Sequence, residues 1–205
     1  MVGKTDDEAQ TVRAAQRGDV DAFNVLVLRY QDAAFSLAFR LLSDRATAAD
    51  VAQEAMIAAF QQLRGFRGEN FRAWLLRIVT NRCYDELRRQ RRRPTVSLSP
   101  DPGEEDLPIP DEALSPEESA QQRELQRAIQ RCIDALNPDQ RVALVLCDVE
   151  GLEYHDIAQS VGAQIGTVKS RISRARSSVR DCLRKFRELL PASYRLIIDD
   201  EDRTS

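Results

Sequence analysis

The chain has 205 residues, of which 42% are hydrophobic and 31% are charged, and its formal net charge is -3. Its longest uninterrupted apolar runs, 55–60 and 142–147, are far shorter than the roughly 20 residues of a membrane-spanning helix. The N-terminal stretch MVGKTDDEAQ lacks the apolar segment of a signal peptide. We therefore expect a cytoplasmic protein without membrane insertion, built as one large domain or two small ones.

Residue types that catalyse reactions or bind metals are sparse in this sequence. The four cysteines, Cys83, Cys132, Cys147 and Cys182, form no CxxC pair, and His155 is the only histidine. Metal sites usually combine closely spaced ligands, so we expect no metal site and reduced, mostly buried thiols. The chain also contains no GxSxG, phosphate-loop or HExxH motif. The sequence predicts a protein that is not an enzyme and has no cofactor.

The segment 47–63 is predicted to form an amphipathic helix, because apolar residues recur along it at intervals of three and four. On the other side Ile57 stands among polar residues, which suggests a surface that contacts a protein; plain solvation of this side is the alternative. The predicted buried side consists of Ala52, Ala55, Met56, Ala59 and Leu63, and the exposed side of Asp50, Gln53, Glu54, Ile57 and Gln61.

The next predicted helix, FRAWLLRIVTNRCYDELRRQRRR (71–93), has one apolar face and one face that mixes aromatic rings, arginines and an amide. Rings can stack on bases while arginines contact phosphates, so this mixture is typical of single-stranded nucleic-acid binding. A purely structural face is the alternative, and burial is favoured for Trp74 taken alone. The apolar face consists of Leu76, Val79, Cys83 and Leu87, and the mixed face of Trp74, Arg77, Asn81, Tyr84 and Arg88.

The composition changes sharply after Arg93. Residues 94–120 contain six of the eight prolines and eight acidic residues, with no Lys or Arg. Proline density and like-charge repulsion both oppose a packed element. We therefore predict two small helical domains, an all-α fold, joined by a flexible linker. The expected boundaries are 1–93 for the first domain, 94–114 for the acidic linker, 115–187 for the second domain and 188–205 for an acidic tail.

Helix-start signals mark the second domain. SPEE (115–118) has a capping serine, proline at the first helical position and a glutamate three residues after the cap. NPDQ (137–140) repeats this signal, and Gly151 is predicted to end the helix that follows. The stretch YHDIAQSVGAQIGTVKSRISRAR (154–176) is typical of a helix-turn-helix, in which Ala158 allows close packing, Gly162 permits a positive φ and Val168 anchors the second helix.

The second helix of this motif has a polar side that suits DNA. Residues 169–187 contain eight cations and only one acid, Asp181. Small hydroxyl residues let the backbone approach a groove, an arginine can reach a guanine edge, and flanking cations suit phosphates. A solvated amphipathic helix is the alternative. The apolar stripe consists of Val168, Ile172, Ala175, Val179, Leu183 and Phe186, and the polar side of Ser170, Ser173, Arg174 and Ser177, flanked by Lys169 and Arg171.

Together these features resemble a bacterial extracytoplasmic-function (ECF) RNA polymerase sigma factor of the sigma-70 superfamily, which has only sigma domains 2 and 4. The resemblance rests on DVAQEAMIAAFQQLRGFRG, FRAWLLRIVTNRCYDELRRQRRR and GLEYHDIAQSVGAQIGTVKSRISRAR, and it covers about residues 10–187. It implies a transcription initiation factor whose partners are core RNA polymerase, promoter DNA and an anti-sigma factor. It also implies that the linker threads toward the polymerase active site and RNA exit path.

The resemblance further implies which residues bind each partner. Core polymerase would contact the exposed side of the helix 47–63. Melted −10 DNA would bind the helix 71–93 and the loop before it, and −35 duplex DNA would bind the helix-turn-helix. The resemblance implies core-polymerase contacts at Asp50, Gln53 and Glu54, and the exposed side of the helix adds Ile57. It implies −10 contacts at Phe66, Arg67, Gly68, Arg77, Asn81, Arg82, Arg88 and Arg89, with Phe66, Arg67, Gly68 and Asn81 around a flipped base, and the mixed face adds Trp74 and Tyr84. It implies −35 contacts at Thr167, Lys169, Ser170, Ser173 and Arg174, and the cationic flank adds Arg171.

Two positions depart from the pattern. Cys147 stands where many relatives have an arginine that supports −35 contacts, and Gln164 replaces a proline common in the turn. A stand-alone helix-turn-helix regulator, with the first domain as a sensor or dimerisation module, is the alternative function. The aromatic and cationic face of 74–88 argues against it, because a ligand sensor needs no such face.

Overall fold

A computed structural model describes the protein as a set of helices in two groups. Capping residues set where helices of the first group begin. Asp19 and Asp44 cap successive helices by accepting hydrogen bonds from the N–H groups of Ala22 (3.0 Å) and Thr47 (2.7 Å). Ser43, in the left-handed region at φ 58°, ends one of these helices and leads into the next. The described residues are 3–68, 70–92, 116–191 and 194, and the first group comprises α1 (Gly3–Gln16), α2 (Val20–Leu42), α3 (Arg45–Gln62), the 3-10 turn η1 (Leu63–Gly65) and α4 (Phe71–Arg92).

The core of the first group confirms the predicted helix faces. Small alanines of α3 lie buried, which lets α2 and α4 pack closely against it. On α4 the predicted apolar face is fully buried at Leu76, Val79 and Cys83, and its fourth member, Leu87, is partly buried. Of the predicted buried side of α3, Met56 alone is only partly buried. Helical periodicity was therefore a sound guide to burial within this group.

The second group begins with α5 and ends with a short 3-10 segment. Asn137 caps α6 by accepting a hydrogen bond from the N–H group of Asp139 (3.0 Å), and Pro138 occupies the first helical position, as predicted. Gly151, at φ +65°, lies just beyond a π-helical turn that extends α6. The elements are α5 (Pro116–Asp134), α6 (Pro138–Leu144), the π-helical turn η2 (Val145–Val149), α7 (Tyr154–Val161), α8 (Ile165–Leu183) and η3 (Arg184–Leu189).

The helix-turn-helix is confirmed by α7 and α8. Gly162 ends α7 in the left-handed region at φ +62°, a conformation that favours glycine. Ala158 is buried where the two helices meet, and Val168 is fully buried on α8. The predicted linker 94–114, Ser115 and the acidic stretch 197–202 lie outside the described residues.

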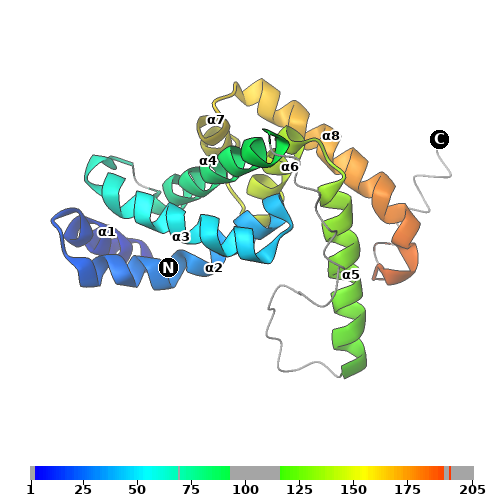
Figure 1. The fold of residues 1–205 in the computed structure, drawn as a ribbon, viewed down its shortest axis with the longest axis horizontal. Coiled ribbons are helices and arrows are strands. Elements are labelled where there is room, and N and C mark those ends of the chain that lie inside the picture. Colours follow the sequence, from blue (N-terminus) through cyan, green and yellow to red (C-terminus); the bar gives the residue numbers. More distant parts are fainter. Residues whose placement is uncertain (1–2, 69, 93–115, 192–193, 195–205) are drawn as a thin grey trace.

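The two groups pack against each other rather than standing apart. In Figure 1, α7 lies against α4, whereas most of α5 and the C-terminal part of α8 extend away from the N-terminal helices; α6 contacts α2. The C-terminal end of α2 contacts α5, where the amide of Gln130 donates to the carbonyl of Arg40 (3.3 Å). One buried hydrophobic cluster runs through both groups, from Val12 to Ala175. No sequence pattern predicts this packing.

The expectation of four reduced thiols is wrong for two of them. Cys132 of α5 and Cys182 of α8 form a disulfide with an S–S distance of 2.09 Å. Cys83 and Cys147 are free, and burial raises the pKa of the Cys83 thiol to about 12. The bridge ties the C-terminal end of α8 to α5, and thus adds a covalent restraint to the helix that carries the predicted −35 residues.

Two further findings concern the described residues. Their helices include none with the length and apolar character needed to cross a membrane. In the same part of the chain, no three His, Cys, Asp or Glu side chains gather as a metal site would require.

Candidate nucleic-acid and polymerase interfaces

The recognition helix α8 presents most of the predicted −35 residues on one exposed side. Its opposite side is anchored by Val168, Ile172 and Ala175, which are at most 1% exposed. Arg171 differs from the others, because it is half-buried and its guanidinium lies 2.6 Å from the carboxylate of Asp139. The exposed members are Thr167, Lys169, Ser170, Ser173 and Arg174.

Neighbouring contacts hold this side of α8 in place. The ammonium of Lys169 lies 5.9 Å from the ring centre of Tyr154 on α7. Arg176 pairs with Asp148 at 2.5 Å, and this hydrogen bond raises the pKa of the arginine. The same guanidinium approaches Cys147 Sγ at 3.6 Å, so the position that departs from the family pattern lies beside a cation supplied by α8. Lys169, Arg176 and Tyr154 border one shallow hollow on this surface.

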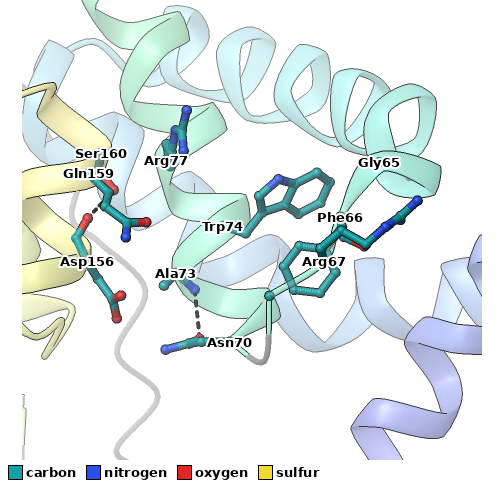
Figure 2. A pocket seen from close by; sticks show the side chains of 11 residues that line it. Gly65, Phe66, Arg67, Asn70, Ala73, Trp74, Arg77, Asp156, Gln159 and Ser160 are labelled. Carbon is teal, nitrogen blue, oxygen red and sulfur yellow. Dashed lines mark hydrogen bonds between the residues drawn. The ribbon is translucent and has the colours of Figure 1, made fainter.

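A second candidate site is a pocket of about 490 Å³ where residues 65–68, Asn70 and α4 face α7. Figure 2 shows Phe66, Arg67 and Trp74 on one side, with α7 on the other. Five predicted −10 residues line this pocket: Phe66, Arg67, Gly68, Trp74 and Arg77. The residues that α7 contributes, Asp156, Gln159 and Ser160, had no predicted role.

Aromatic packing shapes the loop side of the pocket. Phe66 is only 8% exposed. The centre of its ring lies 5.1 Å from the ring centre of Trp74 and 6.0 Å from that of Phe71. A Cβ atom at Gly68 would lie 3.0 Å from this Phe66 ring, so a glycine fits closely here. The buried Phe66 and the half-buried Trp74 therefore pack against each other, and both line the pocket.

Polar contacts fix the same loop. The guanidinium of Arg67 donates to the carbonyl oxygens of Arg64 (2.6 Å) and Phe66 (3.1 Å). Asn70 accepts a hydrogen bond from the N–H group of Ala73 (2.9 Å) and thereby caps the start of α4, as Figure 2 shows. An Asn directly before an apolar helical pattern is a cap signal that the sequence interpretation missed.

The remaining predicted −10 residues lie further along α4, away from this pocket. Asn81 is exposed and is not among the residues that line this pocket. Tyr84 is half-buried, and its hydroxyl donates to the Asp139 carboxylate at 3.2 Å. Burial and the nearby Asp139 charge raise the Tyr84 pKa. The arginines are exposed and each lies near an acid: Arg82 at 3.8 Å from Glu54, Arg88 at 3.2 Å from Asp85 and Arg89 at 2.6 Å from Glu86.

The predicted core-binding residues share the exposed side of α3. Ile57 is 53% exposed, and Phe60, one turn further, is 42% exposed. Phe60 had no predicted role, although its spacing of three from Ile57 places it on a neighbouring part of the same side. Asp50, Gln53 and Glu54 are all exposed there.

Comparisons with known proteins match both groups of helices. The family model of sigma-70 region 2 matches residues 26–93, and that of sigma-70 region 4 matches residues 126–179. The RNA polymerase sigma-H factor of Pseudomonas aeruginosa is 40% identical over 185 residues, which are 87% of this chain and 94% of that protein. The ECF RNA polymerase sigma-E factor of Escherichia coli K12 is 38% identical over 173 residues, which are 82% of this chain and 90% of that protein.

A solved structure gives the same result. The sigma factor RpoE of Bartonella quintana, in complex with the anti-sigma factor NepR, aligns with a TM-score of 0.61 at 30% identity, over 79% of this chain and 96% of that one. The chain has a helix-turn-helix with an exposed cationic side, packed on another helical group with an arginine-rich face. This combination defines the class of protein: an all-helical DNA-binding transcription factor. The chain belongs to the extracytoplasmic-function sigma factors of the sigma-70 family, which are transcription initiation factors.

Proposed function

We propose that this chain binds core RNA polymerase through α3 and directs it to promoters by reading −35 duplex DNA with α8 and melted −10 DNA with α4 and the loop before it. The observation that carries the proposal is the exposure pattern of α8. Five polar or cationic residues lie on the side opposite three buried apolar ones, directly after a helix-turn-helix turn.

The exposed residues of α8 differ in the kind of DNA contact that their side chains can make. Arg174 is long enough to reach a guanine edge in the major groove, where a bidentate arginine contact is the commonest specific one. Lys169 lies on the flank, where a point charge suits a phosphate. Thr167, Ser170 and Ser173 are small enough to let the helix backbone approach the groove floor. Sequence discrimination would then depend mainly on Arg174.

On α4 and its loop, the pocket beside Trp74 is the proposed place for a flipped −10 base. Base extraction costs a few kcal/mol of stacking, which contacts inside a pocket must offset. Trp74 offers ring surface, and Arg67 and Arg77 supply positive charge at the rim. Phe66 acts indirectly by holding Trp74. Asn81, Arg82, Arg88 and Arg89 would follow the strand along the exposed side of α4.

The exposed side of α3 is the proposed core-polymerase surface. An interface core needs apolar area surrounded by polar groups, and Ile57 and Phe60 provide that area beside Asp50 and Glu54. We also propose a cytoplasmic location, no catalytic activity of its own, and regulation by an anti-sigma factor, as in the Bartonella quintana complex.

The first experiment is size-exclusion chromatography of the purified chain with bacterial core RNA polymerase at moderate salt. A stoichiometric complex supports the proposal without any guess about the promoter. Promoters can then be selected from random duplexes with that holoenzyme. If the folded chain forms no complex but binds duplex DNA tightly alone, the stand-alone regulator becomes the better description.

A further inference from the structure

We propose that Gln16, the last residue of α1, is a positioning residue for −10 recognition, because it holds the loop that borders the pocket beside Trp74. The inference deepens the proposed function and rests on it. The side-chain amide nitrogen of Gln16 donates to the carbonyl oxygens of Leu63 (3.1 Å) and Phe66 (2.8 Å). These partners lie 47 and 50 positions further along the chain. A helix without a predicted role thus contacts the loop beside the pocket.

Both contacts require a hydrogen-bond donor at the end of α1. A side-chain amide nitrogen carries two hydrogens, and each of the two carbonyl oxygens can accept one of them. Leu63 begins the η1 turn and Phe66 directly follows it, and the Phe66 N–H group also donates to the Leu63 carbonyl (3.1 Å). Gln16 therefore ties both ends of this turn to α1 with a single group, and a side chain without a donor would release both ends.

The Phe66 carbonyl connects Gln16 to side chains that line the pocket. The same oxygen also accepts from the guanidinium of Arg67 (3.1 Å). The ring centre of Phe66 lies 5.1 Å from that of Trp74, and Figure 2 shows Phe66, Arg67 and Trp74 together on one side of the pocket. Recognition requires that such a wall be held within about 0.5 Å of its productive geometry. A displaced Phe66 would therefore change the fit of a base.

Packing of α1 on α2 fixes the position of Gln16 itself. Val12 and Ala15, on the last turns of α1, are 6% and 4% exposed. Nearer the start of α1, Asp7 lies 3.3 Å from the guanidinium of Arg29 on α2. A side chain on a packed helix positions its partners more precisely than one on a loop. We therefore assign α1 a role in supporting the pocket, in addition to its packing on α2.

The test is Gln16→Met in the full chain, because methionine has a similar length and helix propensity but no donor. Trp74 is the only tryptophan of the chain, so its fluorescence reports the loop side of the pocket without DNA or polymerase. We expect acrylamide to quench Trp74 more strongly in Gln16→Met than in wild type, because Phe66 covers the ring less well.

A holoenzyme made with Gln16→Met should also recognise the −10 bases less well. The ratio of its affinities for a single-stranded oligonucleotide with the selected −10 sequence and for oligonucleotides with one changed base should fall about fivefold or more, the effect of losing roughly one hydrogen bond. Affinities for core polymerase and for the selected −35 duplex should stay unchanged, whereas a general loss of folding would lower them too.

Gln10→Met is the matched control, because it makes the same change at an exposed position of α1. Gln16→Lys restores a donor at the site and should recover most of the −10 discrimination. If Gln10→Met acts like Gln16→Met, or if Gln16→Lys recovers nothing, donation from this position is not responsible and the proposal fails. Unchanged discrimination in a folded Gln16→Met chain also overturns it.

Two further results are distinguishable. Should Gln16→Met fold poorly, Gln16→Glu keeps the shape of the side chain without its donor, and the same measurements decide. A wild-type chain that binds no core polymerase refutes the proposed function, whereas the quenching of Trp74 still decides whether Gln16 holds the loop.

Discussion

Arg72 on α4 donates hydrogen bonds from both terminal nitrogens of its guanidinium to Glu150, which directly follows η2. One terminal nitrogen lies 2.5 Å from the Glu150 carboxylate and the other 2.5 Å from its backbone carbonyl. The Glu150 side chain is only 5% exposed. Burial raises its pKa, while the charges of Arg72 and Arg40 oppose that rise. This pair therefore joins the two groups of helices through a charge that is almost fully removed from water.

Arg72→Met should lower the free energy of unfolding by about 3 kcal/mol, because it leaves the buried Glu150 carboxylate without its partner. Urea denaturation followed by circular dichroism measures this loss. Arg64→Met, a change at an exposed arginine, is the matched control. Adding Glu150→Gln to the Arg72→Met chain should restore part of the loss, because the uncompensated charge is then gone. If Arg72→Met and Arg64→Met lower the free energy of unfolding equally, the Arg72–Glu150 pair has no special role in stability.

The cap of α3 gives a pH-dependent prediction. Hydrogen bonds from Thr47 hold the pKa of Asp44 below its ordinary value of 3.8. The cap therefore stabilises the fold fully above about pH 4 and loses its effect as pH falls through the depressed pKa. Asp44→Ala should cost about 1 kcal/mol at pH 7, and the difference from wild type should shrink in acid.

Asp44→Asn separates the two contributions at this cap. An asparagine still accepts the Thr47 hydrogen bond but does not titrate, so it should retain most of the stability at pH 7. Thermal denaturation of the three chains from pH 3 to pH 7 makes the comparison. A difference between wild type and Asp44→Ala that stays constant across this range would contradict the assigned cap.

The disulfide should contribute measurably to stability. Cys132 and Cys182 are 50 residues apart in sequence, and closing a loop of that length is worth about 4 kcal/mol in the chain-entropy account. A reducing agent should thus lower the unfolding midpoint of wild type but not of Cys132→Ala. Cys147→Ala, which removes a free thiol, should keep the full response to reduction. Alkylation that labels all four cysteines before reduction would show that the bridge does not form in solution.

Local signals explain why much of the fold was predictable. The caps at Asn137 and Gly162, and the faces of α4 and α8, depend on residues within one or two helical turns of each other. The docking of α4 against the second group of helices does not, because its contacts join distant residues: Tyr84 of α4 and Asp139 of α6 are 55 positions apart. Asp139 looked like an ordinary first-turn residue of a helix. Nothing near it in the sequence indicated a partner on α4.

In the candidate sites too, features that depend on local periodicity were predictable, whereas features that depend on tertiary packing were not. Exposure of Lys169, Ser173 and Arg174 followed from periodicity, because an apolar stripe fixes the opposite side of a helix. Burial of Phe66 did not, because it depends on tertiary packing against Phe71 and Trp74. The bridge between Cys132 and Cys182 was missed for a related reason: sequence spacing carries no information about which cysteines a fold brings together.

Recognition of the −35 element should depend on Arg174 for sequence preference and on Lys169 for affinity. Arg174→Ala should cost about 1–3 kcal/mol of discrimination against a changed base pair, whereas Lys169→Ala should weaken binding to all sequences alike and reduce its salt dependence. Competition binding of the holoenzyme to selected and altered −35 duplexes at several salt concentrations compares the two. An Arg174→Ala chain with unchanged preference would mean that another side of α8 faces the groove.

The exposed side of α3 should control assembly with polymerase. Asp50→Lys reverses a charge beside Ile57, so it should weaken core binding by about tenfold or more, the effect of losing roughly 1.4 kcal/mol of interface energy. Competition against wild-type chain for a limiting amount of core polymerase measures the change. Asp32→Lys, on the exposed side of α2, makes the same charge reversal outside the proposed surface. If both variants assemble normally, α3 is not the polymerase-binding surface; if both fail alike, net charge rather than this surface governs the interaction.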